Sequence, residues 1–91
     1  MKKAIRLYLT GNLQSLFFKQ HIKENAEANE IRGFLRIRED SRVEIFLEGT
    51  TDNVNNMIKI CRTSPKYSTI RKVEEKEERL QDFKDFKILN F

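Results

Sequence analysis

The chain has 91 residues, 38% hydrophobic and 35% charged, with a formal net charge of +4 at pH 7. This length predicts one domain over residues 1–91, and the charge is too small to identify nucleic acid as the ligand. A single cysteine, Cys61, excludes an intrachain disulfide framework and fits a reducing compartment. No apolar run approaches the roughly 20 residues that span a bilayer, and no signal-peptide block follows Met1, so we expect a cytoplasmic protein without membrane contact.

The first residues predict a strand followed by a helix. Residues 4–9 alternate between apolar and polar side chains, as a half-buried strand does, and the turn residues 10–12 should end that strand. The following apolar residues recur at helical spacing and predict an amphipathic helix that ends near Asn29. They are Phe18, Ile22 and Ala26.

A hairpin comes next. Residues 31–38 and 42–48 have the composition of two antiparallel strands joined by the polar corner 39–41, and Gly49 should end the second strand. The apolar residues of that second strand share one face. They are Val43, Ile45 and Leu47.

The second helix carries one apolar stripe, and Thr51 or Asp52 is its expected N-cap. Ser64-Pro65 should close the helix, because the residue before proline avoids helical geometry. The apolar stripe consists of Val54, Met57, Ile58 and Cys61, which predicts that the cysteine thiol is packed in the core.

The last third of the chain is ambiguous, because residues 73–84 are rich in Glu and Lys and local propensity favours a helix. Residues 69–73 and 85–91 could equally be strands with a charged connection between them, and the order of the preceding elements predicts a closing strand in this region. We therefore predict an α+β, ferredoxin-like two-layer sandwich with βαββαβ order, an additional C-terminal strand and an antiparallel sheet.

The connection between the first strand and the first helix predicts an anion site. Unpaired N–H groups at a helix start, together with the helix dipole, form a pocket for phosphate or carboxylate, and Lys19 lies one turn into the helix. The predicted anion-binding residues are Asn12, Leu13, Gln14, Ser15, Leu16, Phe17, Phe18 and Lys19. No spaced Cys/His cluster or nucleotide phosphate loop is present, so no metal is expected.

Two segments resemble the acylphosphatase family. Residues 11–19, GNLQSLFFK, are similar to its signature G-x-V-Q-G-V-x-F-R, and residues 33–43, GFLRIREDSRV, are similar to G-W-V-x-N-x-x-D-G-x-V. The resemblance implies a ferredoxin-like fold and hydrolysis of acyl phosphates without a metal or other cofactor. It also implies that a family arginine binds the phosphate and a family asparagine orients the attacking water.

This chain departs from the family at both catalytic positions, because Lys19 replaces the arginine and Ile37 replaces the asparagine. Lysine keeps the charge but not the planar fork that contacts two phosphate oxygens. Isoleucine cannot hydrogen-bond to water, and Ser15 replaces a glycine of the turn. We expect a monomer that binds a small phosphate-containing anion or acyl phosphate and hydrolyses acyl phosphates weakly or not at all.

The hairpin offers an alternative function. Four residues of one parity form a basic face with one aromatic ring: Arg32, Phe34, Arg36 and Arg38. Such a face could bind RNA or an acidic partner without catalysis. Fold order does not choose between these functions, since one fold hosts many.

Overall fold

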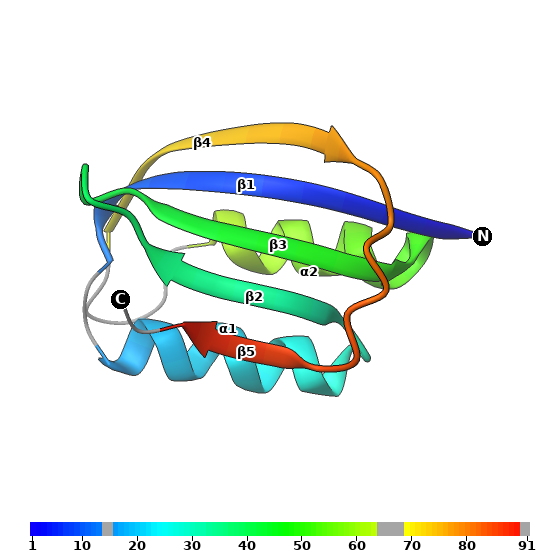
Figure 1. The fold of residues 1–91 in the computed structure, drawn as a ribbon. Helices are drawn as coiled ribbons and strands as arrows, with labels where there is room; N and C mark the ends of the chain where they lie inside the picture. Colours follow the sequence, from blue (N-terminus) through cyan, green and yellow to red (C-terminus); the bar gives the residue numbers. More distant parts are fainter. Residues whose placement is uncertain (14–15, 64–68, 90–91) are drawn as a thin grey trace.

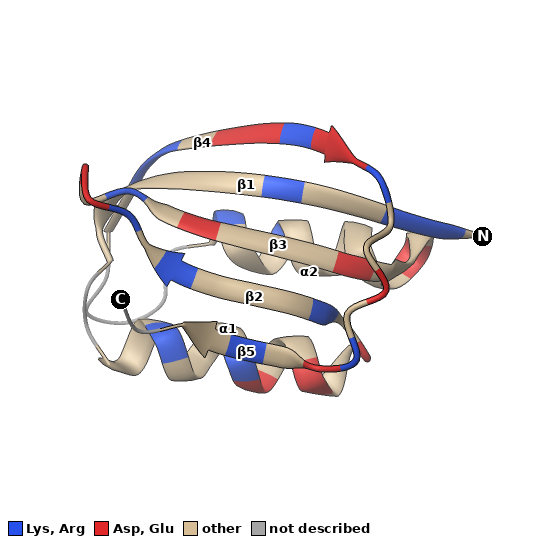
Figure 2. Cartoon of the chain, viewed as in Figure 1, with Lys and Arg blue, Asp and Glu red and all other residues tan. Residues whose placement is uncertain are grey.

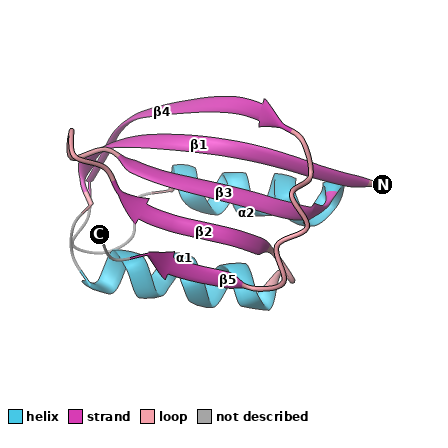
Figure 3. Ribbon diagram, in the orientation of Figure 1, coloured by secondary structure: helices cyan, strands magenta, loops and turns pink. Residues whose placement is uncertain are grey.

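The computed structural model describes residues 1–13, 16–63 and 69–89. Within them, two helices lie on one side of a five-stranded sheet (Figure 1). The elements are β1 (Lys2–Asn12), α1 (Leu16–Ala28), β2 (Arg32–Ile37), β3 (Val43–Thr50), α2 (Thr51–Arg62), β4 (Thr69–Glu78) and β5 (Phe86–Leu89). This confirms the ferredoxin-like α+β prediction, and Figure 3 shows both helices behind the sheet.

The strand order is β4-β1-β3-β2-β5, and the sheet is mixed, so the prediction of an antiparallel sheet was wrong in one pair. Strand β5 runs parallel to β2, whereas β1–β3, β1–β4 and β2–β3 are antiparallel. The chain leaves β4 and enters β5 at the same end of the sheet (Figure 1). Strand β5 therefore runs in the opposite direction to β4 and in the same direction as β2.

Strand β1 is longer than predicted, because residues 10–12 extend it instead of ending it. Gly11 pairs with Ile70 of β4 after a register shift between Thr10 and Gly11. The φ angle of Gly11 is +158°, and a Cβ there would lie 1.9 Å from the Thr69 carbonyl oxygen. Glycine thus permits a close contact between β1 and β4 at this point. The sequence had suggested a turn here.

The transition from β3 to α2 also differs from the prediction. Gly49 does not end the strand, because it pairs with Lys3 of β1 and β3 continues to Thr50. Thr50 is the N-cap of α2, and its Oγ1 accepts a hydrogen bond from the Asn53 backbone N–H at 3.3 Å. Strand β3 thus continues to the cap, which lies one residue before the predicted Thr51 and two before the predicted Asp52.

Strand β4 continues through most of the charged segment that was expected to be a connection. Its pairing with β1 extends from Asn12 back to Ala4, and its charged side chains are largely exposed at the edge of the sheet (Figure 2). Charges suit such an edge, since they hinder pairing with another chain. The Ser64-Pro65 signal lies outside the described residues, and α2 ends at Arg62.

The core lies between the sheet and the helices. It contains the predicted helix residues Phe18, Ile22 and Ala26, together with Val54, Met57 and Cys61. Burial raises the pKa of the Cys61 thiol to about 12, which makes it a packing residue and a poor nucleophile. The described helices include none with the length and apolar character that a membrane crossing requires.

Candidate functional site

The β1–α1 connection carries the predicted anion-binding residues. Asn12 is exposed at the end of β1, whereas the Leu13 side chain is fully buried in the core. Gln14 and Ser15 lie outside the described residues. Leu13 therefore anchors the connection by packing, and a contribution from it to anion binding would come from its main chain.

Helix α1 begins at Leu16, and its first side chains differ in exposure. The Leu16 and Phe17 side chains are exposed, and Phe18 is buried against the sheet. Lys19 is partly exposed one turn into the helix. The first turn of α1 contains no acidic residue, so that turn supplies no carboxylate to offset the positive end of the helix dipole.

Ile37 is the last residue of β2 and pairs with Val43. Its side chain is partly buried and packs against the hydrophobic core on the helix side of the sheet. The end of β2 and the start of α1 lie at the same end of the molecule (Figure 1). The fold thus brings the two predicted catalytic positions to one end of the sheet, where Ile37 offers only hydrocarbon.

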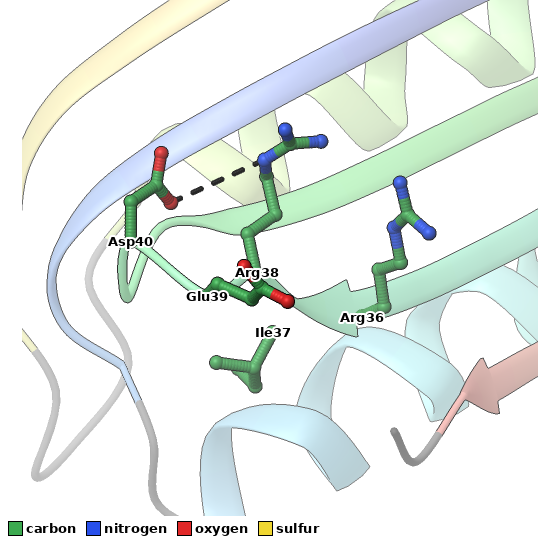
Figure 4. Close-up of a pocket in the computed structure, with 5 residues that line it drawn as sticks. All are labelled: Arg36, Ile37, Arg38, Glu39 and Asp40. Atoms are coloured by element: carbon green, nitrogen blue, oxygen red, sulfur yellow. Dashed lines mark ion pairs between the residues drawn. The ribbon is translucent and has the colours of Figure 1, made fainter.

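A pocket of about 450 Å³ surrounds the end of β2 and is lined by residues 36–40. Figure 4 shows the Arg36 and Arg38 side chains pointing away from that of Ile37. Arg38 Nε lies 4.0 Å from an Asp40 carboxylate oxygen, in the ion pair drawn in that figure. Both guanidinium groups therefore lie on the other side of β2 from the Ile37 side chain.

The arginines instead converge on Glu44 of β3. Glu44 is fully buried and accepts hydrogen bonds from Arg36 Nε at 2.8 Å, from Arg38 Nη1 at 2.9 Å and from Arg6. Burial alone would raise the pKa of this carboxyl. The hydrogen bonds from Arg36 and Arg38 and the nearby positive charges outweigh that effect and lower the pKa below its ordinary value.

Aromatic rings contact three arginine side chains on this face of the sheet. The guanidinium carbons of Arg38 and Arg42 lie 5.5 Å and 4.9 Å from the ring centroid of Tyr8, and that of Arg6 lies 5.3 Å from the ring of Phe46. Stacked contacts of this kind hold the guanidinium groups against the sheet.

These ion pairs bear on the alternative of a basic interaction face. Arg36 and Arg38 share Glu44, Arg6 also pairs with Glu78 at 2.6 Å, and Arg42 pairs with Asp40 at 2.8 Å. Much of the positive charge on this face is therefore balanced by carboxylates among the described residues of the same chain. The hairpin register could have revealed this, since Glu44 lies directly opposite Arg36.

A second carboxylate on this face holds the connection between β4 and β5, which we term the strap (residues 79–85). Glu48 accepts hydrogen bonds from the backbone N–H groups of Gln81 at 3.0 Å, Asp82 at 2.8 Å and Phe83 at 3.4 Å. The Phe83 ring packs against the ring of Phe34, with centroids 5.7 Å apart. Phe34 is thus partly covered by the strap and is not an open stacking platform.

Comparisons with known proteins identify the family of this chain. The family model described as Acylphosphatase matches residues 5–88. An acylphosphatase of Pyrobaculum arsenaticum is 41% identical, over 91% of this chain and 90% of the relative. One of Syntrophus aciditrophicus is 32% identical, over 98% and 94%.

A solved structure has the same fold. The crystal structure of acylphosphatase from Bacillus subtilis superposes with a TM-score of 0.90 at 23% identity, covering 99% of this chain and 100% of that one. At this identity the likeness establishes the fold alone, whereas the family match and the two relatives establish descent. The chain belongs to the acylphosphatase family.

Proposed function

We propose that this chain binds a phosphate-type anion at the β1–α1 connection and hydrolyses acyl phosphates weakly or not at all. The observation that carries the proposal is the position of Ile37 at the end of β2, with its side chain packed against the core. The family resemblance implies a water-orienting asparagine at this position.

Hydrolysis of an acyl phosphate needs its phosphoryl oxygens held, their charge neutralised and a water aimed at phosphorus. Positioning and electrostatic stabilisation dominate such phosphoryl transfers. Lys19 and the N–H groups at the start of α1 would supply the first two requirements. Nothing in the hydrocarbon of Ile37 supplies the third, and loss of one preorganised hydrogen-bonding group lowers a rate on the order of 10²–10³-fold.

Lys19 supports binding more than catalysis. Its ammonium is a point charge on a flexible stem, and it makes fewer fixed contacts with two phosphate oxygens than a guanidinium does. The side chain is only partly buried at the site end of α1, so it can reach an anion without the cost of burying a charge. Weak anion binding combined with slow turnover is therefore the expected behaviour.

The test is hydrolysis of acetyl phosphate, measured as phosphate release by the wild type, Lys19→Arg, Ile37→Asn and the double variant. We expect slow wild-type turnover and a gain of at least tenfold in the double variant, because both family groups are then restored. Fast wild-type turnover that Lys19→Ala leaves unchanged would show that the proposed loss of activity is wrong.

Anion binding is measured separately, by titration with inorganic phosphate monitored by NMR. Lys19→Ala should weaken binding about tenfold, as expected for one charge-assisted contact. Lys23→Ala is the matched control, because Lys23 is also a partly exposed lysine of α1 but lies one turn further from the helix start. Equal effects of the two substitutions would remove Lys19 from the site.

A further inference from the structure

A small polar pocket lies at the opposite end of the sheet from Ile37. Its volume is about 130 Å³, and its walls come from β1, the turn between α1 and β2, β2, β3, the start of α2 and the strap. Arg32 of the pocket begins β2 and Ile37 ends that strand, so the two residues lie roughly 17 Å apart along it. The pocket is therefore separate from the proposed anion site.

The base of the pocket is the face of the sheet that the strap crosses (Figure 1). Lys2 of β1 is the partner of Thr50 in β3, and Arg32 of β2 is the partner of Glu48. Paired residues, and residues two apart in one strand, point to the same face of a sheet. Because Glu48 binds the strap, all four side chains point to the strap side, and Lys2 and Arg32 flank β3.

Arg32 has no acidic partner among the described residues, although Glu48 lies directly opposite it. Glu48 uses both of its carboxylate oxygens to accept backbone N–H groups of the strap. The Lys2 side chain likewise forms no ion pair or hydrogen bond with a described residue. By contrast, Arg36 and Arg38 of the same face share Glu44. Two cations of the pocket are thus left for another partner.

Two carboxylates complete the charge pattern. Glu30 belongs to the turn between α1 and β2, and Asp82 belongs to the strap; both are exposed and line the pocket. In the described part of the chain, neither carboxylate has an ion-pair partner. A simple anion would meet these carboxylates, and a simple cation would meet Lys2 and Arg32, whereas a ligand that carries both charges finds a partner for each.

We propose that this pocket binds a small zwitterion of the α-amino-acid class, such as glycine or alanine. The ligand carboxylate accepts hydrogen bonds from the planar guanidinium of Arg32 and from Lys2, and the ligand ammonium donates to Glu30 and Asp82. The pocket volume of about 130 Å³ corresponds to about four water molecules. This space suits glycine or alanine and is too small for an aromatic amino acid.

The strap forms one wall of this site, so binding should also hold the strap closed. A ligand that binds only the closed form lowers the open population by a factor that grows with its concentration. At about ten times the dissociation constant, the backbone amides of Gln81 and Asp82 should therefore exchange with solvent about tenfold more slowly.

The test is titration of the isotope-labelled protein with glycine, monitored by NMR. We expect saturable shifts of the Thr50, Asn53 and Asp82 amides, with a dissociation constant on the order of 1–10 mM, because the charges are exposed and the ligand is small. N-acetylglycine lacks the ammonium and glycinamide lacks the carboxylate. Each should bind at least about fivefold more weakly than glycine, since one set of charge-assisted contacts is lost.

Arg32→Ala should weaken glycine binding about tenfold, and Arg32→Lys should weaken it less, because lysine keeps the charge and loses the planar fork. Arg71→Ala is the matched control, because Arg71 is also an exposed arginine of a strand but lies on β4, outside the pocket. It should bind glycine as the wild type does. The amide spectrum of each variant establishes that the fold is retained.

Three results would overturn the inference. Absence of saturable shifts with glycine up to about 100 mM, well above the expected dissociation constant, would remove the site. Equal binding of glycine and of N-acetylglycine or glycinamide would exclude selection of a zwitterion. Equal effects of Arg32→Ala and Arg71→Ala would exclude Arg32 as the carboxylate partner. None of these results bears on acetyl phosphate hydrolysis or phosphate binding, which test the β1–α1 connection separately.

Discussion

Ile37 and Val43 are direct partners in the antiparallel register of β2 and β3, and Val43 is fully buried. Paired residues of an antiparallel sheet point to the same face, so the Ile37 side chain faces the helices. The position at which the family resemblance implies a water-orienting asparagine is thus part of the packing at the end of the sheet. The substitution Ile37→Asn, which tests the proposed function, should therefore affect stability as well.

Ile37→Asn should lower the free energy of unfolding by about 1–2 kcal/mol, because a half-buried hydrocarbon is replaced by an amide that retains some access to water. Urea denaturation measures the change. Ile37→Val is the control and should cost less than about 1 kcal/mol. If the asparagine variant is as stable as the wild type, the contact of Ile37 with the core contributes nothing.

Glu44→Gln should lower the free energy of unfolding by about 2 kcal/mol. The substitution leaves Arg6, Arg36 and Arg38 close together without the buried carboxylate that they share. Breaking a fully buried pair costs about 3–5 kcal/mol, and the partial exposure of these arginines reduces that cost. Glu39→Gln, at an exposed glutamate of the same hairpin, should change stability by less than about 0.5 kcal/mol.

The same carboxylate makes stability depend on pH. Because the pKa of Glu44 in the folded protein lies below its ordinary value of 4.5, the unfolded chain takes up the proton first as pH falls. The contribution of Glu44 is therefore complete above pH 5 and is lost as pH falls through the folded pKa.

Urea denaturation of the wild type and Glu44→Gln at several values between pH 7 and pH 3 tests this linkage. The stability difference between the two proteins should be constant from pH 7 to about pH 5 and should shrink at lower pH. A difference that stays constant down to pH 3 would contradict a lowered pKa for Glu44.

The fold could be predicted from the sequence where periodicity and pairing agree. The stripe at Phe18, Ile22 and Ala26 and the alternation in the hairpin both correspond to buried residues. The prediction failed where pairing with a distant strand overrides a local signal. Gly11 and Gly49 suggested turns, and both lie within strands because β1 pairs with β4 and β3.

The anion site itself stays a prediction. The motif located Lys19 and Ile37, and the fold places them on elements that meet at one end of the sheet. Sequence reasoning assigned Arg36 and Arg38 to a basic face, because parity along one strand does not show which groups the side chains bind. The pairing of Glu44 with these arginines requires the hairpin register, and the contact of Glu48 with the strap joins residues more than 30 apart in the chain.

Glu48 should hold the strap against the sheet, and its replacement should loosen the strap locally. A carboxylate that accepts several backbone N–H groups forms charge-assisted hydrogen bonds, which are stronger than those of a neutral amide. In Glu48→Gln we expect the amides of Gln81 and Asp82 to exchange with solvent about tenfold faster, as measured by NMR hydrogen exchange. Phe34 and Phe46 should remain packed, because the ring contacts with Phe83 persist.

The control for this experiment is Glu77→Gln, which makes the same change of charge at an exposed residue of β4 and should leave those two exchange rates unchanged. Amides far from the strap, such as that of Leu7 in the centre of β1, report global opening and should exchange at wild-type rates in both variants. If all amides of Glu48→Gln accelerate together, Glu48 stabilises the whole domain and not the strap. If the Gln81 and Asp82 amides exchange at wild-type rates, the ring of Phe83 alone is sufficient to hold the strap.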